Sequence, residues 1–368
     1  MRRLFVVLAL AASVAQSAQA QNAWQAELGI QGGYSNVKPS GTSASDARSF
    51  FMVPGASTVA PILTYGSVYA IIPWKDKIAV EPTLGFAQLS LGSGATAGRL
   101  GVRLNYAISP KLYGGAGGVL NYIEQSGSHG TQLGVQLGFG YRMKIAPGLN
   151  GRLEAQWVST KRGDNVTGPF NAYSVLVGVS SRIGGRSTAA PARRAAAGNR
   201  LWSRAIGVNA GYSRVHLVGG GGDATFLSAP GVGNSLGALG TYVPAPTTLF
   251  AIFPIGKKTA LEPGLDITSA DASGTGANLT VGAALRLDYA VSGGWYGAVG
   301  GQLSHVKPNV GNSASVFGGS LAWGYRFHLS GDFGGRVEMN YLTFPHNNDL
   351  GVATNTFSVL LGATMPLK

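Results

Sequence analysis

The feature that most constrains this chain is an alternation of apolar residues with polar or small ones. Between residues 132 and 144, for example, Leu133, Val135 and Leu137 alternate with Gly134 and Gln136. A period of two predicts a β-strand with two different faces, because successive side chains of a strand point to opposite sides. About eight such segments occur in each half of the chain, each near the ~10 residues that a tilted strand needs to cross a bilayer. The sequence therefore predicts an all-β protein.

The first residues predict export. Arg2 and Arg3 precede an apolar run over residues 4–14, and Ala18-Gln19-Ala20 follows it. This order is typical of a secretory signal peptide, which we assign to residues 1–20. No later stretch is continuously apolar over the ~20 residues that a membrane-spanning helix needs. The chain has no cysteine, which excludes disulfide staples and thiolate metal sites.

The chain contains two copies of one unit. Motifs recur in the same order at a spacing of about 180 residues, which indicates an internal repeat. The clearest pairs are Glu81-Pro82 with Glu262-Pro263, Arg103-Leu104-Asn105-Tyr106 with Arg286-Leu287-Asp288-Tyr289, and Gly151-Arg152-Leu153-Glu154 with Gly335-Arg336-Val337-Glu338. We assign the first repeat to residues 21–185 and the second to residues 201–368. Residues 186–200 are rich in Ala, Pro and Arg and predict a linker.

Several features favour a transmembrane barrel over a soluble β-sandwich. The connections alternate between tight turns and longer loops, as in outer-membrane barrels. The polar face holds Gly, Ser, Gln and few charges, whereas a sandwich would present many Lys and Glu to water; 57 of the 368 residues are glycine. Aromatic residues also fall near strand ends and suggest girdles at the two membrane interfaces. We expect Trp24, Tyr106, Tyr141 and Trp202 at the inner ends, and Tyr34, Trp157 and Tyr212 at the outer ends.

Each half resembles the small eight-stranded outer-membrane barrels of the OmpA and OmpX type, on strand pattern rather than on a diagnostic motif. The resemblance implies residence in the cell outer membrane and says little about activity. Phe357, Val359 and Leu361 alternate toward the C-terminus, as in the terminal strand by which bacterial barrels are recognised for insertion, although Lys368 replaces the usual terminal Phe. This implies the barrel-assembly machinery as a partner during insertion.

The alternation places charged residues of both signs on the inward faces. The predicted lumen charge network comprises Glu81, Arg103, Arg142, Arg152 and Glu154 in the first copy, and Glu262, Arg286, Asp288, Arg326, Arg336 and Glu338 in the second. An eight-stranded barrel is just wide enough for side chains to fill it. Charges removed from water must pair, so a paired ionic plug is the simpler interpretation. A selective pore lining or an acid/base site is the alternative.

Other chemistry has weak support. The five histidines lack metal-ligand spacing, so neither a metal site nor a cofactor is expected. Ser128-His129 and Ser304-His305 lack a visible orienting acid, and no enzyme is predicted. Phe50 and Phe51 in one copy, and Phe226 and Leu227 in the other, suggest apolar tips of the first outer loop, which could contact a surface ligand or fold over their own barrel. Lys and Arg exceed Asp and Glu by 13, which in an exported protein suits anionic lipid or lipopolysaccharide rather than nucleic acid.

Two architectures remain open: two tandem eight-stranded barrels, or one sixteen-stranded barrel with an aqueous channel. The long linker favours two barrels, since a continuous sheet needs only a short turn. Closed barrels predict a structural or surface-interaction protein, whereas merged barrels predict a diffusion porin. A lipid-modifying enzyme of the outer membrane is a distant third hypothesis.

Overall fold

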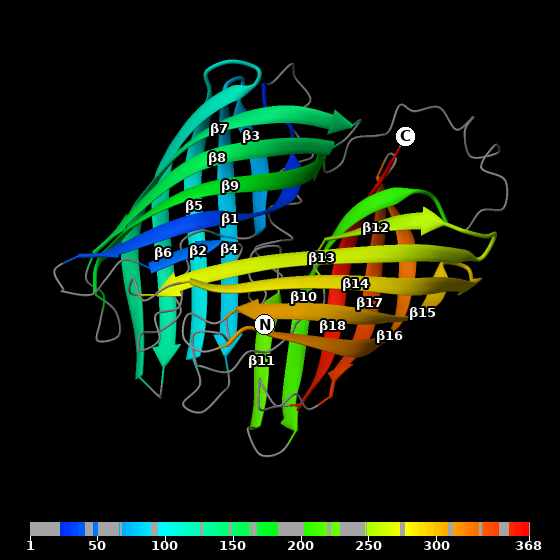
Figure 1. Cartoon of the computed structure of the whole chain (residues 1–368). Coiled ribbons are helices and arrows are strands. Elements are labelled where there is room, and N and C mark those ends of the chain that lie inside the picture. Colours follow the sequence, from blue (N-terminus) through cyan, green and yellow to red (C-terminus); the bar gives the residue numbers. More distant parts are fainter. Residues whose placement is uncertain are drawn as a thin grey trace, which may run out of the picture.

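The computed structural model describes residues 23–40, 47–50, 66, 68–89, 95–125, 128–146, 149–161, 163, 168–182, 202–218, 222–228, 247, 249–272, 277–307, 312–330, 333–345 and 353–367. In these residues the chain forms eighteen β-strands (Figure 1). Those of the first half are β1 (Glu27–Pro39), β2 (Ala47–Phe50), β3 (Val68–Lys75), β4 (Ile78–Leu89), β5 (Ala95–Ala107), β6 (Leu112–Gln125), β7 (Ser128–Ala146), β8 (Leu149–Thr160) and β9 (Phe170–Arg182). Those of the second half are β10 (Ala205–Val218), β11 (Gly222–Ser228), β12 (Leu249–Pro254), β13 (Thr259–Ala272), β14 (Ala277–Ser292), β15 (Trp295–Lys307), β16 (Ala314–Ser330), β17 (Phe333–Phe344) and β18 (Ala353–Pro366). The predicted signal peptide and the linker lie outside the described residues.

The first half closes into an eight-stranded barrel at one end. Strands β3 to β9 pair antiparallel in chain order, β1 pairs with β9 along its whole length, and Glu27 to Ile30 of β1 pair with Ile71 to Val68 of β3. Tight turns join β3 to β4 and β5 to β6 at this end, which we call the inner end. Short turns mark the periplasmic side of outer-membrane barrels.

The second half repeats this arrangement. Strands β12 to β18 pair in order, and β10 pairs with β18 along its length and with β12 near the inner end. The tight turn between β14 and β15 uses Gly293 and Gly294, whose positive φ angles of 54° and 97° favour glycine. The all-β fold and the barrel pattern predicted from the alternation are confirmed.

The two barrels exchange strands toward their outer ends. Strand β2 lies between β1 and β13, because Phe50 pairs with Tyr34 on one side and with Ser269 on the other (Figure 1). Conversely, β11 of the second half pairs with β10 and lies beside β4 of the first half. At the outer ends sixteen strands thus lie side by side as an outer ring, in the order β1, β2, β13 to β18, β10, β11 and β4 to β9, with backbone pairing at every step among the described residues except between β11 and β4; the inner half holds two rings of eight. This arrangement is compatible with both architectures left open by the sequence.

Side chains alternate between the lipid-facing surface and the lumen as predicted. On β7, Leu133, Val135, Leu137 and Phe139 are exposed, whereas Gln132 and Gln136 are buried. Outside the membrane-spanning strands, the described residues include no helix long and apolar enough to cross a bilayer.

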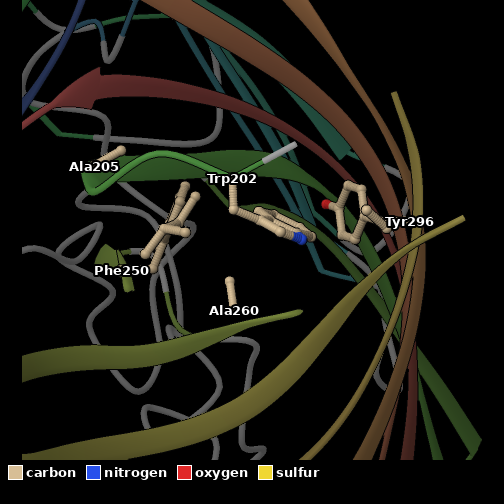
Figure 2. Close-up of a cluster of buried hydrophobic side chains, with 7 residues drawn as sticks. Trp202, Ala205, Phe250, Ala260 and Tyr296 are labelled. Atoms are coloured by element: carbon tan, nitrogen blue, oxygen red, sulfur yellow. The ribbon is translucent and has the colours of Figure 1, made fainter. Parts of the chain in front are cut away.

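The girdle prediction was wrong for two tryptophans. Trp24 and Trp202 are each only 2% exposed and point into the lumen at the inner end, where their indole N–H groups donate to the carbonyl oxygens of Lys77 (3.0 Å) and Lys258 (2.8 Å). Figure 2 shows Trp202 inside the second barrel beside Tyr296, with ring centroids 5.5 Å apart. Both tryptophans precede the first strand residue, so the alternation does not extend to them. Exposed aromatic residues near the inner end include Trp74, Tyr106, Tyr141, Tyr289, Trp295, Trp323 and Tyr325.

Candidate functional site

The lumen of the first barrel holds a compact ion cluster, the first plug, made of Glu81 on β4, Arg103 on β5, and Arg152 and Glu154 on β8. All four side chains are buried. The Nη1 and Nη2 atoms of Arg103 donate to both oxygens of Glu154 at 2.7 and 2.6 Å, and Nη2 also lies 2.9 Å from Oε1 of Glu81. Arg152 donates to both oxygens of Glu81 at 2.8 and 3.2 Å. Each arginine thus meets two carboxylates, and the cluster of two cations and two anions is neutral.

Neutral groups complete the first plug. The Tyr113 hydroxyl donates to Glu154 at 2.5 Å, and Asn105 donates to Glu81 at 2.8 Å. The guanidinium of Arg152 donates to Gln31 and lies 3.6 Å from the ring centroid of Tyr69. These contacts satisfy oxygens and N–H groups that water would otherwise have to reach.

Glycine on β7 makes room for this cluster. A Cβ atom at Gly138 would lie 1.9 Å from Nη1 of Arg103, and one at Gly140 would lie 2.3 Å from Cζ of Tyr113. The wall positions opposite the largest plug side chains therefore exclude any larger residue, which accounts for part of the high glycine content.

The second barrel holds an equivalent cluster, the second plug, made of Glu262, Arg286, Arg336 and Glu338. Arg286 donates to both oxygens of Glu338 at 2.6 and 2.8 Å, and Arg336 donates to both oxygens of Glu262 at 2.5 and 3.2 Å. Tyr296 donates to Glu338 at 2.6 Å, as Tyr113 does to Glu154. The same arrangement of two arginines, two glutamates and one tyrosine is thus built twice from repeated sequence.

The two barrels differ in the position of one acidic residue near the plug. In the first barrel Glu27 lies near the inner end and accepts hydrogen bonds from Arg142, Asn150 (2.8 Å) and Ser180 (2.5 Å). The second barrel has Ala205 at that register, but it has Asp288 where the first has Asn105. Each barrel therefore keeps three acids and three arginines in this region, counted as Glu27, Glu81, Glu154 with Arg103, Arg142, Arg152, and Glu262, Asp288, Glu338 with Arg286, Arg326, Arg336.

This difference in position predicts compensation. Replacing Glu27 with Ala should lower the free energy of unfolding by about 2 kcal/mol, because Arg142 loses its carboxylate partner. Asn105→Asp alone should also destabilise, since it adds a second anion beside Glu81. The double variant should lose less than the sum of the two, as measured by urea unfolding in detergent micelles. The matched variants in the second barrel are Ala205→Glu and Asp288→Asn, and their combination should likewise lose less stability than the sum of the two single variants. If the losses in free energy of unfolding simply add in either barrel, the two positions do not compensate for each other.

On the outer side of the plugs, each lumen holds an apolar cluster beside buried polar side chains such as Gln132 and Ser304. Val37, Val119, Val158, Phe170 and Ala172 form a buried cluster in the outer half of the first barrel, and Val316, Leu342 and Phe344 form one in the second. Below the plugs, Trp24 and Trp202 lie under the guanidinium groups of Arg142 and Arg326, each 4.6 Å from the ring centroid. Each lumen therefore holds an ionic plug at its middle, a tryptophan on the inner side, and an apolar cluster with buried polar side chains on the outer side.

The structure brings eight of the eleven predicted charges into the two plugs: Glu81, Arg103, Arg152, Glu154, Glu262, Arg286, Arg336 and Glu338. Asp288 lies beside the second plug, 3.5 Å from Arg286 Nε, and Arg142 and Arg326 lie nearer the inner end. Three further charges were missed: Glu27, Arg99 and Asp266 are also buried. The alternation could have revealed Arg99 and Asp266, because each lies an even number of residues from a predicted inward residue of its own strand, Arg103 and Glu262 respectively. No inward charge was predicted on β1, the strand of Glu27.

The predicted loop tips lie elsewhere. Phe50 ends β2, and Phe226 and Leu227 lie in β11, so these three are strand residues paired with neighbours in the sheet and not loop residues. Phe51 lies outside the described residues. The sequence could not reveal this, since short strands at the outer ends have too few residues for a readable alternation.

Ser304 and His305 do not form a catalytic pair. Ser304 is buried in the lumen, and His305, the next residue on β15, points the other way, where its Nδ1 lies 2.9 Å from Oγ of Ser315 on β16. Within the part of the chain that the structure describes, no three His, Asp or Glu side chains gather as a metal site.

Comparisons with known proteins identify one matching family. Residues 6–182 match the family described as outer membrane protein beta-barrel domain, a span that ends with β9. The search of curated proteins finds no significant match. Among solved structures, an outer membrane channel from Pseudomonas putida F1 is 10% identical with a TM-score of 0.26, covering 95% of this chain and 99% of that chain. The OccK11 (OpdR) protein of Pseudomonas aeruginosa is 10% identical with a TM-score of 0.28, covering 94% and 96%. The chain is an integral β-barrel protein of the cell outer membrane.

Proposed function

We propose that this outer-membrane β-barrel protein has a structural or surface-interaction role, that it conducts no solutes, and that it is not an enzyme. The observation that carries the proposal is the filling of both lumens by neutral ion clusters, the two plugs. We further propose that each unit is a small barrel of the OmpA and OmpX type and that outer-membrane lipid and a surface ligand or lipopolysaccharide are its partners.

The geometry of the plugs supports a structural role over a pore lining. Arginines that line a water-filled channel keep N–H groups free for ions and water, whereas Arg103 and Arg286 each place two N–H groups on one carboxylate. Bidentate arginine–carboxylate pairs are among the strongest polar contacts in proteins. Opening a path would require breaking several of them among side chains that are buried from solvent.

The strand exchange supports a surface role. Strand β2 joins the outer halves of the two barrels into one sheet, and β11 lies beside β4. The outer ends of both units therefore lie next to each other, and a sheet edge of this kind is a scaffold on which binding loops are commonly carried. A porin of sixteen strands remains the competing function, because the outer half alone has the strand number of a wide pore.

Conductance in a planar bilayer separates these functions. We expect the refolded mature protein to give no stable current steps, because both plugs close the lumen. A mobility shift on heating before electrophoresis must first show that the barrels are folded. Large, stable steps from the folded wild type would replace the structural proposal with the porin. As a positive control, the double variant Arg103→Ala with Glu154→Ala should show small, brief openings through the first barrel.

A further inference from the structure

A basic pocket lies at the inner mouth of the first barrel, outside the plug. It encloses about 490 Å³ and is lined by Lys111, Arg142, Lys144, Asn150 and Arg182, together with Ala23, Gln25, Pro110 and Met143. We use the name basic pocket for this site. Its cations come from three separate places in the chain: the β5–β6 turn, the inner end of β7 and the last residue of β9.

The charge of the basic pocket is not balanced by its neighbours. Glu27 lies beneath it, but that carboxylate is fully buried and already accepts hydrogen bonds from Arg142, Asn150 and Ser180. Arg182 donates to the neutral amide of Gln25. No ion pair joins Lys111, Lys144 or Arg182 to any acid within the described ranges. Three exposed cations around one pocket repel one another unless an anion lies between them.

The second barrel shows that the fold itself does not require these cations. The backbone N–H of Arg142 donates to the carbonyl of Lys111, and in the second barrel that of Arg326 donates to the carbonyl of Gly294, so Gly294 replaces Lys111. By the strand registers, Pro366 replaces Arg182 and His328 replaces Lys144. The arginine over the tryptophan is kept in both barrels, whereas the rim cations occur in one.

The position of the pocket in the membrane indicates its ligand. On β7, Tyr141, Met143 and Ile145 are exposed on the lipid-facing surface, and Lys144 lies between the last two. Exposed tyrosines near strand ends lie at the level of the lipid headgroups. Lys111, Lys144 and Arg182 therefore lie where the phosphate groups of the periplasmic leaflet are found, and basic side chains at that depth attract anionic headgroups.

We propose that the basic pocket binds the phosphate-bearing headgroup of an anionic phospholipid from the periplasmic leaflet. Lys111, Lys144 and Arg182 supply the positive rim, and Asn150 supplies an amide beside it. The exposed side chain of Met143 contacts the first part of the acyl chains.

Native mass spectrometry of the full mature chain tests this proposal. The protein is released from vesicles of equal parts phosphatidylcholine and phosphatidylglycerol, and the retained lipid is counted. We expect the wild type to retain phosphatidylglycerol selectively and the variant Lys111→Gln with Lys144→Gln to retain at least about tenfold less, since each lysine near an anionic surface contributes to binding. Neither lysine contacts the plug, so this double variant should fold, as the mobility shift on heating will verify.

The matched control removes the same charge from the same end of the other barrel. Lys257 and Lys258 lie in the β12–β13 turn, and Lys257→Gln with Lys258→Gln should leave lipid retention unchanged. Equal losses in both variants would reduce the effect to general surface charge and overturn the site. Unchanged retention in the Lys111/Lys144 variant would also overturn it. Inorganic phosphate is titrated into protein in phosphatidylcholine vesicles, and lysine-dependent binding of phosphate without any preference for phosphatidylglycerol would overturn the lipid assignment.

Discussion

Replacing Glu154 with Gln is expected to lower the free energy of unfolding by about 3 to 5 kcal/mol, the cost of removing one partner from a buried ion cluster. Glu154 accepts hydrogen bonds from Arg103 at 2.7 and 2.6 Å and from Tyr113 at 2.5 Å, and Arg152 lies 3.6 Å away. Glutamine has almost the same shape, so the variant isolates the charge. Two arginines then share the single carboxylate of Glu81. Urea titration in detergent micelles, read as loss of the heat-modifiable band, measures the change.

Two further variants serve as controls for the loss of stability in Glu154→Gln. Glu124→Gln removes the same charge from an exposed residue whose carboxylate accepts a hydrogen bond from Tyr122 at 3.0 Å, and it should change stability by less than about 0.5 kcal/mol. Glu338→Gln should match Glu154→Gln, since Glu338 accepts the equivalent bonds from Arg286 and Tyr296. If Glu154→Gln is no more destabilising than Glu124→Gln, the ion clusters do not hold the lumens closed.

The second large effect concerns the strand exchange. After a protease site is inserted in the predicted linker and cut, the two halves are expected to remain together on a native detergent gel, because β2 pairs with strands of both barrels. Replacing Arg48 and Ser49 with proline should weaken this association, which then rests on the contact between β11 and β4 alone. Successive N–H groups of a strand point to opposite neighbours, so two prolines remove donors toward both β1 and β13. The fraction of separated halves, measured by densitometry, should rise clearly above that of the cut wild type.

Alanine at the same two positions is the control, since it keeps both N–H groups and should leave the cut halves associated. If the cut wild type separates as readily as the proline variant, the barrels are independent bodies and the sixteen-stranded outer ring does not persist in solution. Separation in the alanine variant would instead assign the association to the side chains of β2.

Much of the lumen could be predicted from alternation alone. Glu81, Arg103 and Glu154 lie inward because each is an even number of residues from other inward residues of its own strand, a rule that needs only local geometry. The same rule places Glu27 and Arg99 inward, although neither is among the predicted lumen charges. It failed for Trp24 and Trp202, since these residues lie outside the strands and their direction depends on where the chain enters the barrel.

The sequence by itself determined that this chain is exported, that it forms membrane-spanning strands in two repeated units, and which residues of each long strand face inward. These properties are encoded within segments of about ten residues, because side-chain direction repeats every second residue. Only the tertiary structure decided which carboxylate contacts which arginine and that β2 pairs with a strand of the other barrel. It also decided that the second barrel, which has Ala205 at the register of Glu27, carries its third acid at Asp288. Those contacts join strands far apart in the chain, and a short strand such as β2 can satisfy its backbone hydrogen bonds on more than one neighbour, so its partners depend on the whole sheet.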